Sequence, residues 1–189
     1  MISERALRFV DEVVLDGMRS ALARPDQDVQ LSLESGEPAL AKPAMTRDGV
    51  CVVLTVTCYT FRMMWVMLFS RDVATYAYLA GLRGKSVDDL SATQRADLLS
   101  ECGNMCCGSI NRDLGLVFPH LGMSTPITLP SGSLQHLDVL AFDQLRRYHL
   151  TDGNGISFRG LLGISDFGDL DFSPPPRAPA QASGELELF

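Results

Sequence analysis

The sequence has few basic residues and very few histidines. It contains 16 Lys and Arg against 23 Asp and Glu, its net charge is −7, and it has no run of basic residues. A nucleic-acid-binding surface needs clustered positive charge to neutralise phosphates, so this composition argues against a nucleic-acid partner. The three histidines, His120, His136 and His149, are scattered, which indicates structural or surface roles for them.

The N-terminal segment lacks the features of a secretory signal, because residues 1–17 carry acidic side chains early and no uncharged apolar stretch. The five cysteines are an odd number without the spacing of a disulfide framework. Free thiols are typical of a reducing compartment. We therefore expect a cytoplasmic protein.

One apolar segment, residues 51–70, could be mistaken for a transmembrane helix. It is 20 residues long and Arg62 is its only charge. It is also rich in β-branched and aromatic residues, which favour strands, and Arg62 would lie at mid-bilayer, where a charge is costly. Two adjacent buried strands are the favoured interpretation, and no membrane association is expected.

The periodicity predicts an α+β fold. Apolar residues at helical spacing predict helices over residues 3–23 and 91–117, and residues 71–82 are expected to form a further helix that ends before Gly84. Strands are expected near residues 29–33, over 51–70, and near 124–129, 136–149 and 156–165. The expected architecture is an antiparallel-rich sheet with two or three helices packed on one face, including one long helix.

The composition changes after residue 172, where three consecutive prolines are followed by small residues and the end Glu-Leu-Glu-Leu-Phe. We therefore divide the chain into a domain over residues 1–172 and a flexible, Pro-rich acidic tail over 173–189. The last five residues resemble the short motif that docks on bacterial sliding clamps. A disordered end with two chance leucines is the simpler interpretation.

The predicted helix over residues 91–117 has an unusual exposed face. Ser91 and Gln94 have the spacing of a capping box at its start. At 100° per residue, one face carries Asp97, Glu101, Asn104, Gly108, Asn111 and Gly115. The opposite face carries Leu99, Cys102, Cys106, Ile110 and Val117. Gly and Asn reduce helix stability, so this strip favours a functional surface over an ordinary solvated face.

Two glycines of this helix have different expected roles. Gly108 lies on the exposed strip, where the missing side chain would let another surface come close. Gly103 instead suggests tight packing against a neighbouring element.

The pair Glu101 and Asn104 can support only a limited chemistry. A carboxylate and an amide three residues apart lie side by side on a helix, where they can bind a cation and hold a water. They cannot activate a stable ester. They suffice for a substrate that is already activated, such as an acyl phosphate bound to a metal, because positioning and charge stabilisation supply most of the rate of phosphoryl transfer.

The segment from Glu101 to Gly108 resembles the E-x-x-N-x-x-x-G segment of the CheC/CheX chemotaxis phosphatases. Asp97 lies four residues before Glu101, and Pro126 lies 22 residues after Asn104, as in the wider family pattern. The order of predicted elements over residues 3–170 also resembles the CheX branch. CheC proteins carry two copies of the motif and this chain carries one, which favours the CheX-like branch and its homodimer.

The resemblance implies a phosphatase that hydrolyses the aspartyl phosphate of a CheY-type response regulator. Asn104 would orient the attacking water, and Glu101 would pair with the receiver's active-site lysine. Asp97, Gly108 and Pro126 would support or line the contact with the receiver. The chain would need no cofactor or metal of its own, because the Mg²⁺ belongs to the receiver, and a CheD-like protein is a candidate regulator.

Two alternatives stay open. The first is a receiver-binding module of the same fold that has lost turnover, as in flagellar switch proteins, within a chemotaxis or other two-component pathway. The second is a metal or redox site at Cys102, Cys106 and Cys107, although zinc usually needs further ligands.

Overall fold

The computed structural model describes residues 1–24, 27–34, 49–153 and 155–172. Its helices are α1 (Glu4–Leu22), α2 (Val73–Leu82) and α3 (Ala92–Leu114), with the 3₁₀ helices η1 (Val87–Asp89) and η2 (Ser131–Leu140). Its strands are β1 (Gln30–Leu33), β2 (Val50–Thr57), β3 (Phe61–Phe69), β4 (Gly122–Met123), β5 (Ile127–Pro130), β6 (Gln144–Thr151) and β7 (Ser157–Asp166). The tail predicted over residues 173–189 lies outside the described residues, so the domain boundary stays a prediction.

All the strands belong to one sheet with antiparallel pairing. The order is β1-β6-β7-β3-β2-β4, and β5 also pairs with β2. The apolar segment 51–70 forms the hairpin of β2 and β3, in which Leu54 lies opposite Trp65. This confirms the predicted strand pair. Among the described helices, none has the length and the hydrophobicity that a membrane span requires.

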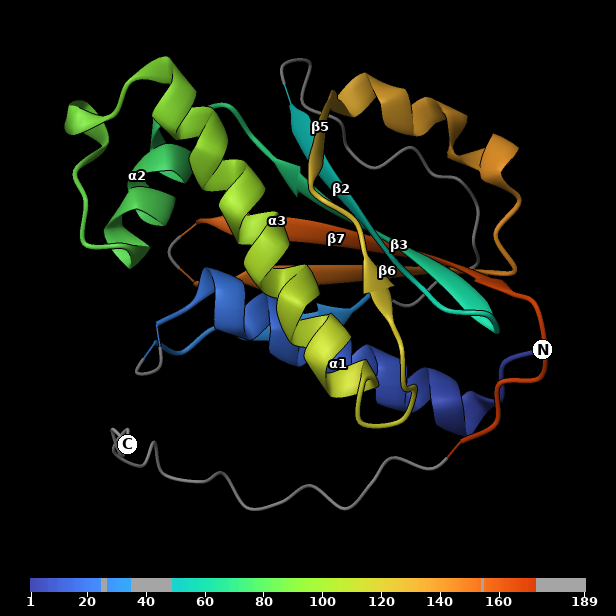
Figure 1. Cartoon of the computed structure of the whole chain (residues 1–189). Coiled ribbons are helices and arrows are strands. Elements are labelled where there is room, and N and C mark those ends of the chain that lie inside the picture. Colours follow the sequence, from blue (N-terminus) through green and yellow to red (C-terminus); the bar gives the residue numbers. More distant parts are fainter. Residues whose placement is uncertain (25–26, 35–48, 154, 173–189) are drawn as a thin grey trace, which may run out of the picture.

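The sheet is covered differently on its two faces. Figure 1 shows α3 passing across one face and crossing α1, with α2 beside the first half of α3. Alternate residues of β2, such as Val52 and Leu54, are fully buried in the main core together with α1 and α3. On the other face, Leu134 and Leu137 of η2 cover Cys51, Val66 and Leu161. The predicted α+β class is therefore confirmed.

The three predicted α-helices are present, with small differences at their ends. Ser3 caps α1 by accepting a hydrogen bond from the Ala6 amide at 3.2 Å. Asp72 caps α2 by accepting from the Thr75 amide at 2.7 Å. The helix α3 ends at Leu114 instead of near residue 117, because the chain then tightens into a turn.

The strand predicted over residues 136–149 is wrong in its first half. Residues 131–140 form η2, and β6 begins only at Gln144. Ala141 has a left-handed backbone with φ of 45°, which an extended strand cannot contain, so the chain changes direction there. Only the second half of the strand predicted near residues 124–129 is extended, as β5, and the short β4 lies just before this range, whereas the strands near 29–33 and 156–165 are confirmed.

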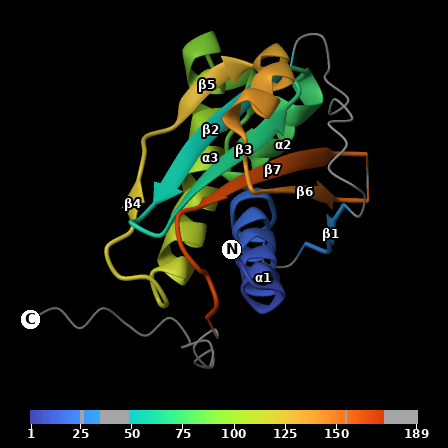
Figure 2. The same cartoon turned by 90° about the vertical axis from the view of Figure 1, so that its right-hand side faces the viewer.

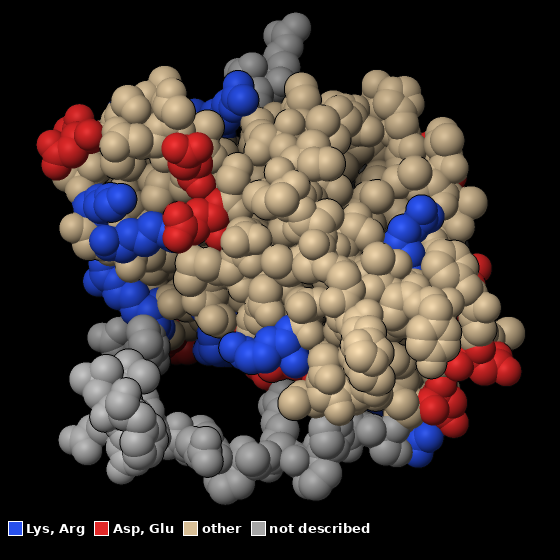
Figure 3. Space-filling model, viewed as in Figure 1, with Lys and Arg blue, Asp and Glu red and all other residues tan. Residues whose placement is uncertain are grey.

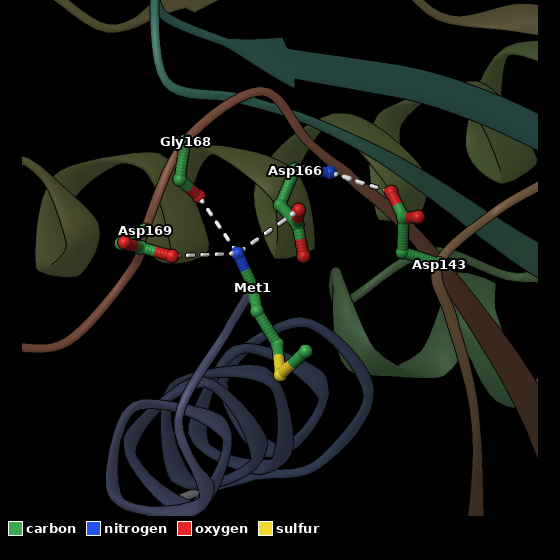
Figure 4. Close-up of polar contacts among 5 residues, drawn as sticks. All are labelled: Met1, Asp143, Asp166, Gly168 and Asp169. Atoms are coloured by element: carbon green, nitrogen blue, oxygen red, sulfur yellow. Dashed lines mark hydrogen bonds and ion pairs between the residues drawn. The ribbon is translucent and has the colours of Figure 1, made fainter.

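The N-terminus and the segment after β7 are held together, as Figure 4 shows. The ammonium group of Met1 donates to the Gly168 carbonyl and to the Asp169 carboxylate, both at 3.2 Å. It also lies 3.3 Å from the Asp166 carboxylate. The backbone of Leu170 bonds to both Met1 and Ser3. The start of α1 is thereby fixed against the end of β7.

A buried polar cluster joins α1 to the sheet. Asp11 of α1 is 7% exposed and accepts hydrogen bonds from the Tyr148 hydroxyl at 2.7 Å and from Arg146 Nε at 3.1 Å. A second nitrogen of Arg146 completes a bidentate pair with the carboxylate. Burial and the nearby Asp11 carboxylate raise the pKa of Tyr148 well above its ordinary value, so the phenol stays protonated.

Candidate functional site

The helix α3 begins with the predicted capping box. The Ser91 hydroxyl accepts from the Gln94 amide at 3.3 Å, and the Gln94 side chain accepts from the Ser91 amide at 2.9 Å. These two bonds satisfy donors that would otherwise be free at the first turn. They fix the start of the helix that carries the candidate site residues.

The predicted inner face of α3 is buried. Leu99, Cys102, Cys106 and Ile110 are each no more than 2% exposed. Gly103 also lies on this side, where a Cβ atom would be 2.5 Å from Cγ1 of Val52 in β2. No ordinary side chain fits there without movement, so glycine allows α3 to lie close to the sheet. The expectation of tight packing at this position is confirmed.

The outer face of α3 carries the candidate site residues. Asp97, Glu101 and Asn104 are all exposed, and none of them makes a hydrogen bond or ion pair within the described part of the chain. Gly108 lies on the same face, and a Cβ atom placed there would meet no atom of the described residues within 4 Å apart from its neighbours in the helix. We call these four residues the α3 strip. The sequence spacing therefore placed them correctly on one accessible surface.

Pro126 lies between β4 and β5, in the segment that runs beside α3 in Figure 1. The segment is held to the sheet by Ser124, whose hydroxyl accepts from the Thr55 amide at 2.9 Å and whose amide donates to the Thr55 carbonyl at 2.9 Å. It is held to the helix by the hydroxyls of Ser100 and Thr128, which are 3.2 Å apart. These contacts bring Pro126, which is distant from α3 in the sequence, to the sheet edge beside this helix.

The structure adds two residues that the sequence did not indicate. Arg83, at the C-cap of α2, directs its guanidinium to Cys102 Sγ at 3.1 Å and to Met105 Sδ at 3.4 Å. These sulfur atoms belong to the residues directly after Glu101 and Asn104. Met105 is 44% exposed, which is high for a large apolar side chain. Arg83 is 18 residues before Glu101 in the chain, and no local pattern connects the two.

The cysteines beside the strip are buried free thiols. Burial raises the pKa of Cys106 well above its ordinary value and raises that of Cys107 to about 12. Burial also raises the pKa of Cys102. Neutral thiols are poor nucleophiles and poor metal ligands. No group of three metal-binding side chains occurs among the residues that the structure describes.

The face that carries α3 has an uneven charge distribution. In Figure 3 the acidic and basic side chains gather near α2 and the first half of α3, and most of the remaining face is uncharged. The exposed apolar residues of β4 and β5 contribute to this uncharged area, namely Met123, Ile127 and Leu129. Glu101 and Asn104 could therefore bind a polar group of a partner while the rest of the partner covers the uncharged surface around them.

Comparison with known proteins gives the fold its context. The sequence matches no protein-family model. It also matches no curated protein. Several solved structures nevertheless share the fold of the chain.

A chain in the crystal structure of the CheX-CheY-BeF3-Mg²⁺ complex from Borrelia burgdorferi is 11% identical, with a TM-score of 0.58 over 85% of this chain and 97% of that one. A CheC-like superfamily protein from Shewanella sp. PV-4 is 11% identical, with a TM-score of 0.55 over 86% and 99%. Chemotaxis protein CheX from Vibrio vulnificus is 12% identical, with a TM-score of 0.54 over 85% and 99%. The chain therefore has the fold of the CheX and CheC-like chemotaxis proteins, as the sequence resemblance predicted.

Proposed function

We propose that this chain is a CheX-like phosphatase that hydrolyses the aspartyl phosphate of a CheY-type response regulator. The observation that supports this most is the exposed pair Glu101 and Asn104 on α3, within a fold shared with CheX and CheC-like proteins. Asp97 lies one turn before the pair, and the segment of Pro126 runs beside the helix. Position and residue type therefore agree with the motif that the sequence resembles.

The proposed reaction needs little chemistry from this chain. A water oxygen attacks phosphorus while the bond from phosphorus to the aspartyl oxygen breaks, which yields inorganic phosphate and a free carboxylate. The Asn104 amide accepts a hydrogen bond from the water and keeps it in line, and Glu101 pairs with the receiver lysine. The receiver's Mg²⁺ neutralises charge on the phosphoryl oxygens. Positioning of this kind can supply a large part of a rate enhancement.

The surface around the pair suits close contact with a receiver. Gly108 leaves open space one turn beyond Asn104, and Met105 offers apolar area next to it. The carboxylates of Asp97 and Glu101 have no hydrogen-bond partner among the described residues, so they are available to a partner protein. We propose that Asp97, Gly108 and Pro126 contact the receiver domain.

The partners of this chain follow from the same reasoning. The structure from Borrelia burgdorferi contains CheY together with CheX, which supports a receiver of that type as the substrate here. A second copy of this chain, a CheD-like regulator and a cytoplasmic location remain parts of the proposal. Gel filtration coupled to light scattering tests the homodimer directly.

The activity is tested by following a phosphorylated receiver with and without this chain. Each purified response regulator of the source genome is phosphorylated, and its loss of phosphate is measured with the chain in catalytic amounts. We expect one or more receivers to lose phosphate faster. Asn104→Ala should reduce turnover by about 100-fold or more, because the water is no longer held. If every receiver loses phosphate at an unchanged rate in the presence of a saturating concentration of this protein, the proposal is refuted.

Two control variants separate catalysis from binding. Asn111→Ala removes an amide two turns beyond Asn104 and should leave turnover within about twofold. Glu101→Gln should weaken receiver binding, whereas Glu12→Gln, at an exposed position of α1, should not. If the chain binds a phosphorylated receiver tightly and never accelerates its decay, it is the non-catalytic binding module of the same fold.

A further inference from the structure

A hollow of about 570 Å³ lies at the N-terminal end of α3, bordered by α2 and by the start of β2. This volume is within the range of small-molecule sites. Part of its wall is apolar, formed by Val50, Leu90 and Leu99. The α3 strip lies on a different face of the helix, since Asp97 and Glu101 do not line the hollow. The hollow therefore has no role in the proposed hydrolysis.

Two arginines also line the hollow, and neither has an ion-pair partner within the described part of the chain. Arg71 is exposed and makes no hydrogen bond there. Arg95 donates one hydrogen bond to the Val87 carbonyl at 3.3 Å, and its guanidinium carbon lies 5.9 Å from the centroid of the Tyr76 ring. The Nε atom of Arg95 is buried and has no hydrogen-bond partner among the described residues. A buried charged donor without an acceptor is costly, so this atom calls for an explanation.

Among the described residues, no acidic side chain lines the hollow, so an anionic ligand would meet no negative charge in its wall. From α3, Ala92, Arg95, Ala96 and Leu99 line it together, so the hollow lies along the side of the first turns of this helix. Thr128 contributes a hydroxyl that is already tied to Ser100. Positive groups above an apolar wall match a ligand that is anionic at one end and apolar at the other.

We propose that this hollow binds a small organic anion, in which a phosphate or carboxylate is attached to an apolar or aromatic group. The anionic end contacts the guanidinium groups of Arg71 and Arg95, and the apolar end lies against Val50, Leu90 and Leu99. The aromatic ring of Tyr76 adds a flat surface beside Arg95 for a planar ligand. This site is independent of the receiver phosphatase activity.

The site is tested with four simple probes and amide chemical shifts of the full chain. Phenyl phosphate and benzoate carry the charge and the ring, benzyl alcohol carries only the ring, and inorganic phosphate carries only the charge. We expect saturable shifts centred on Tyr76, Ala92, Arg95 and Thr128 with the two aromatic anions. Benzyl alcohol and inorganic phosphate should bind at least tenfold more weakly. Comparison of the two aromatic anions decides between a phosphate and a carboxylate ligand.

Variants assign the binding to the two arginines. Arg71→Gln and Arg95→Gln should each weaken binding by about tenfold or more, the range expected when a hydrogen bond to a charged group is lost. Arg19→Gln, an exposed arginine at the end of α1, should leave binding unchanged. Arg71→Lys keeps the charge at an exposed position and should retain most of the affinity.

Several results would overturn the proposal. These are no saturable shifts up to the solubility of the aromatic anions, equal binding of benzyl alcohol, or equal affinity in Arg71→Gln and the Arg19→Gln control. Unfolding of Arg95→Gln would not affect the decision, because Arg71→Gln alone tests the contact at an exposed residue.

Discussion

Gly103 and Gly108 lie on the same helix, five residues apart, and replacement of each by alanine should change stability in opposite directions. In an exposed helix interior, Gly→Ala stabilises a protein by about 1 kcal/mol, because glycine has more conformational freedom to lose. A Cβ at Gly108 meets no atom within 4 Å, so Gly108→Ala should show this full gain. For a chain of this size, the gain corresponds to a rise in Tm of about 2–4 °C.

At Gly103 the same change meets the sheet. The added Cβ would lie 2.5 Å from Cγ1 of Val52 and 3.2 Å from Cδ1 of Leu54, both in buried β2. Overpacking of this kind costs about 1–3 kcal/mol. After subtraction of the helix gain of about 1 kcal/mol, Gly103→Ala should lose between about 0 and 2 kcal/mol. The two variants should therefore differ by about 1–3 kcal/mol.

Urea unfolding followed by circular dichroism measures both changes, provided that the m values stay equal. The cause at Gly103 is tested by a double-mutant cycle with Val52→Ala, which makes room for the new methyl group. The two changes should be coupled, with the double variant more stable than the sum of the single effects predicts. If Gly103→Ala stabilises the chain as much as Gly108→Ala, the close approach of α3 to β2 is refuted as the reason for this glycine.

Three further predictions follow. Asp11→Ala should cost about 3 kcal/mol in urea unfolding, because it leaves Arg146 and the buried Tyr148 without their acceptor, and adding Arg146→Leu should recover part of the loss. The raised pKa of Cys107, about 12 against an ordinary 9.0, means that the folded state holds this proton longer. Its contribution to the free energy of unfolding should therefore be complete below about pH 9 and fall between pH 9 and 12, by up to about 1.4 kcal/mol per pH unit. In Cys107→Ala the free energy of unfolding should fall less steeply with pH over this range. Met105→Ala should raise the KM for the phosphorylated receiver several-fold and leave Tm within about 2 °C, because this side chain is 44% exposed.

The helices α1 and α3 and the central strands could be predicted because each has a clear pattern of apolar residues. The apolar spacing of α1 and α3 and the β-branched run of β2 and β3 leave few alternatives. The segment 131–140 could not be predicted in the same way. Leu134 and Leu137 are three residues apart, which suits a 3₁₀ helix, but two apolar residues do not distinguish this structure from a strand. The chain turns at Ala141 through a left-handed backbone conformation, which alanine does not favour and which the sequence therefore does not predict.

The candidate site was predictable where it depends on helix geometry and not where it depends on tertiary contacts. The spacing of Asp97, Glu101 and Asn104 placed them together on one exposed face of α3. Arg83 reaches this helix only because α2 packs against it, and its contacts with Cys102 and Met105 have no signature in the sequence. The same reason explains why the arginines of the hollow near Ala92 were not anticipated.

The glycines of α3 also show which part of the helix is incomplete without a partner. Each interior glycine costs about 1 kcal/mol relative to alanine. At Gly103 the chain offsets this cost itself, because the helix gains close contact with Val52 and Leu54. At Gly108 no described residue occupies the space, so the described part of the chain offers no contact that compensates the cost. A gain that compensates it would have to come from a surface that approaches the helix at this point, which is the contact proposed for the receiver beside Glu101 and Asn104.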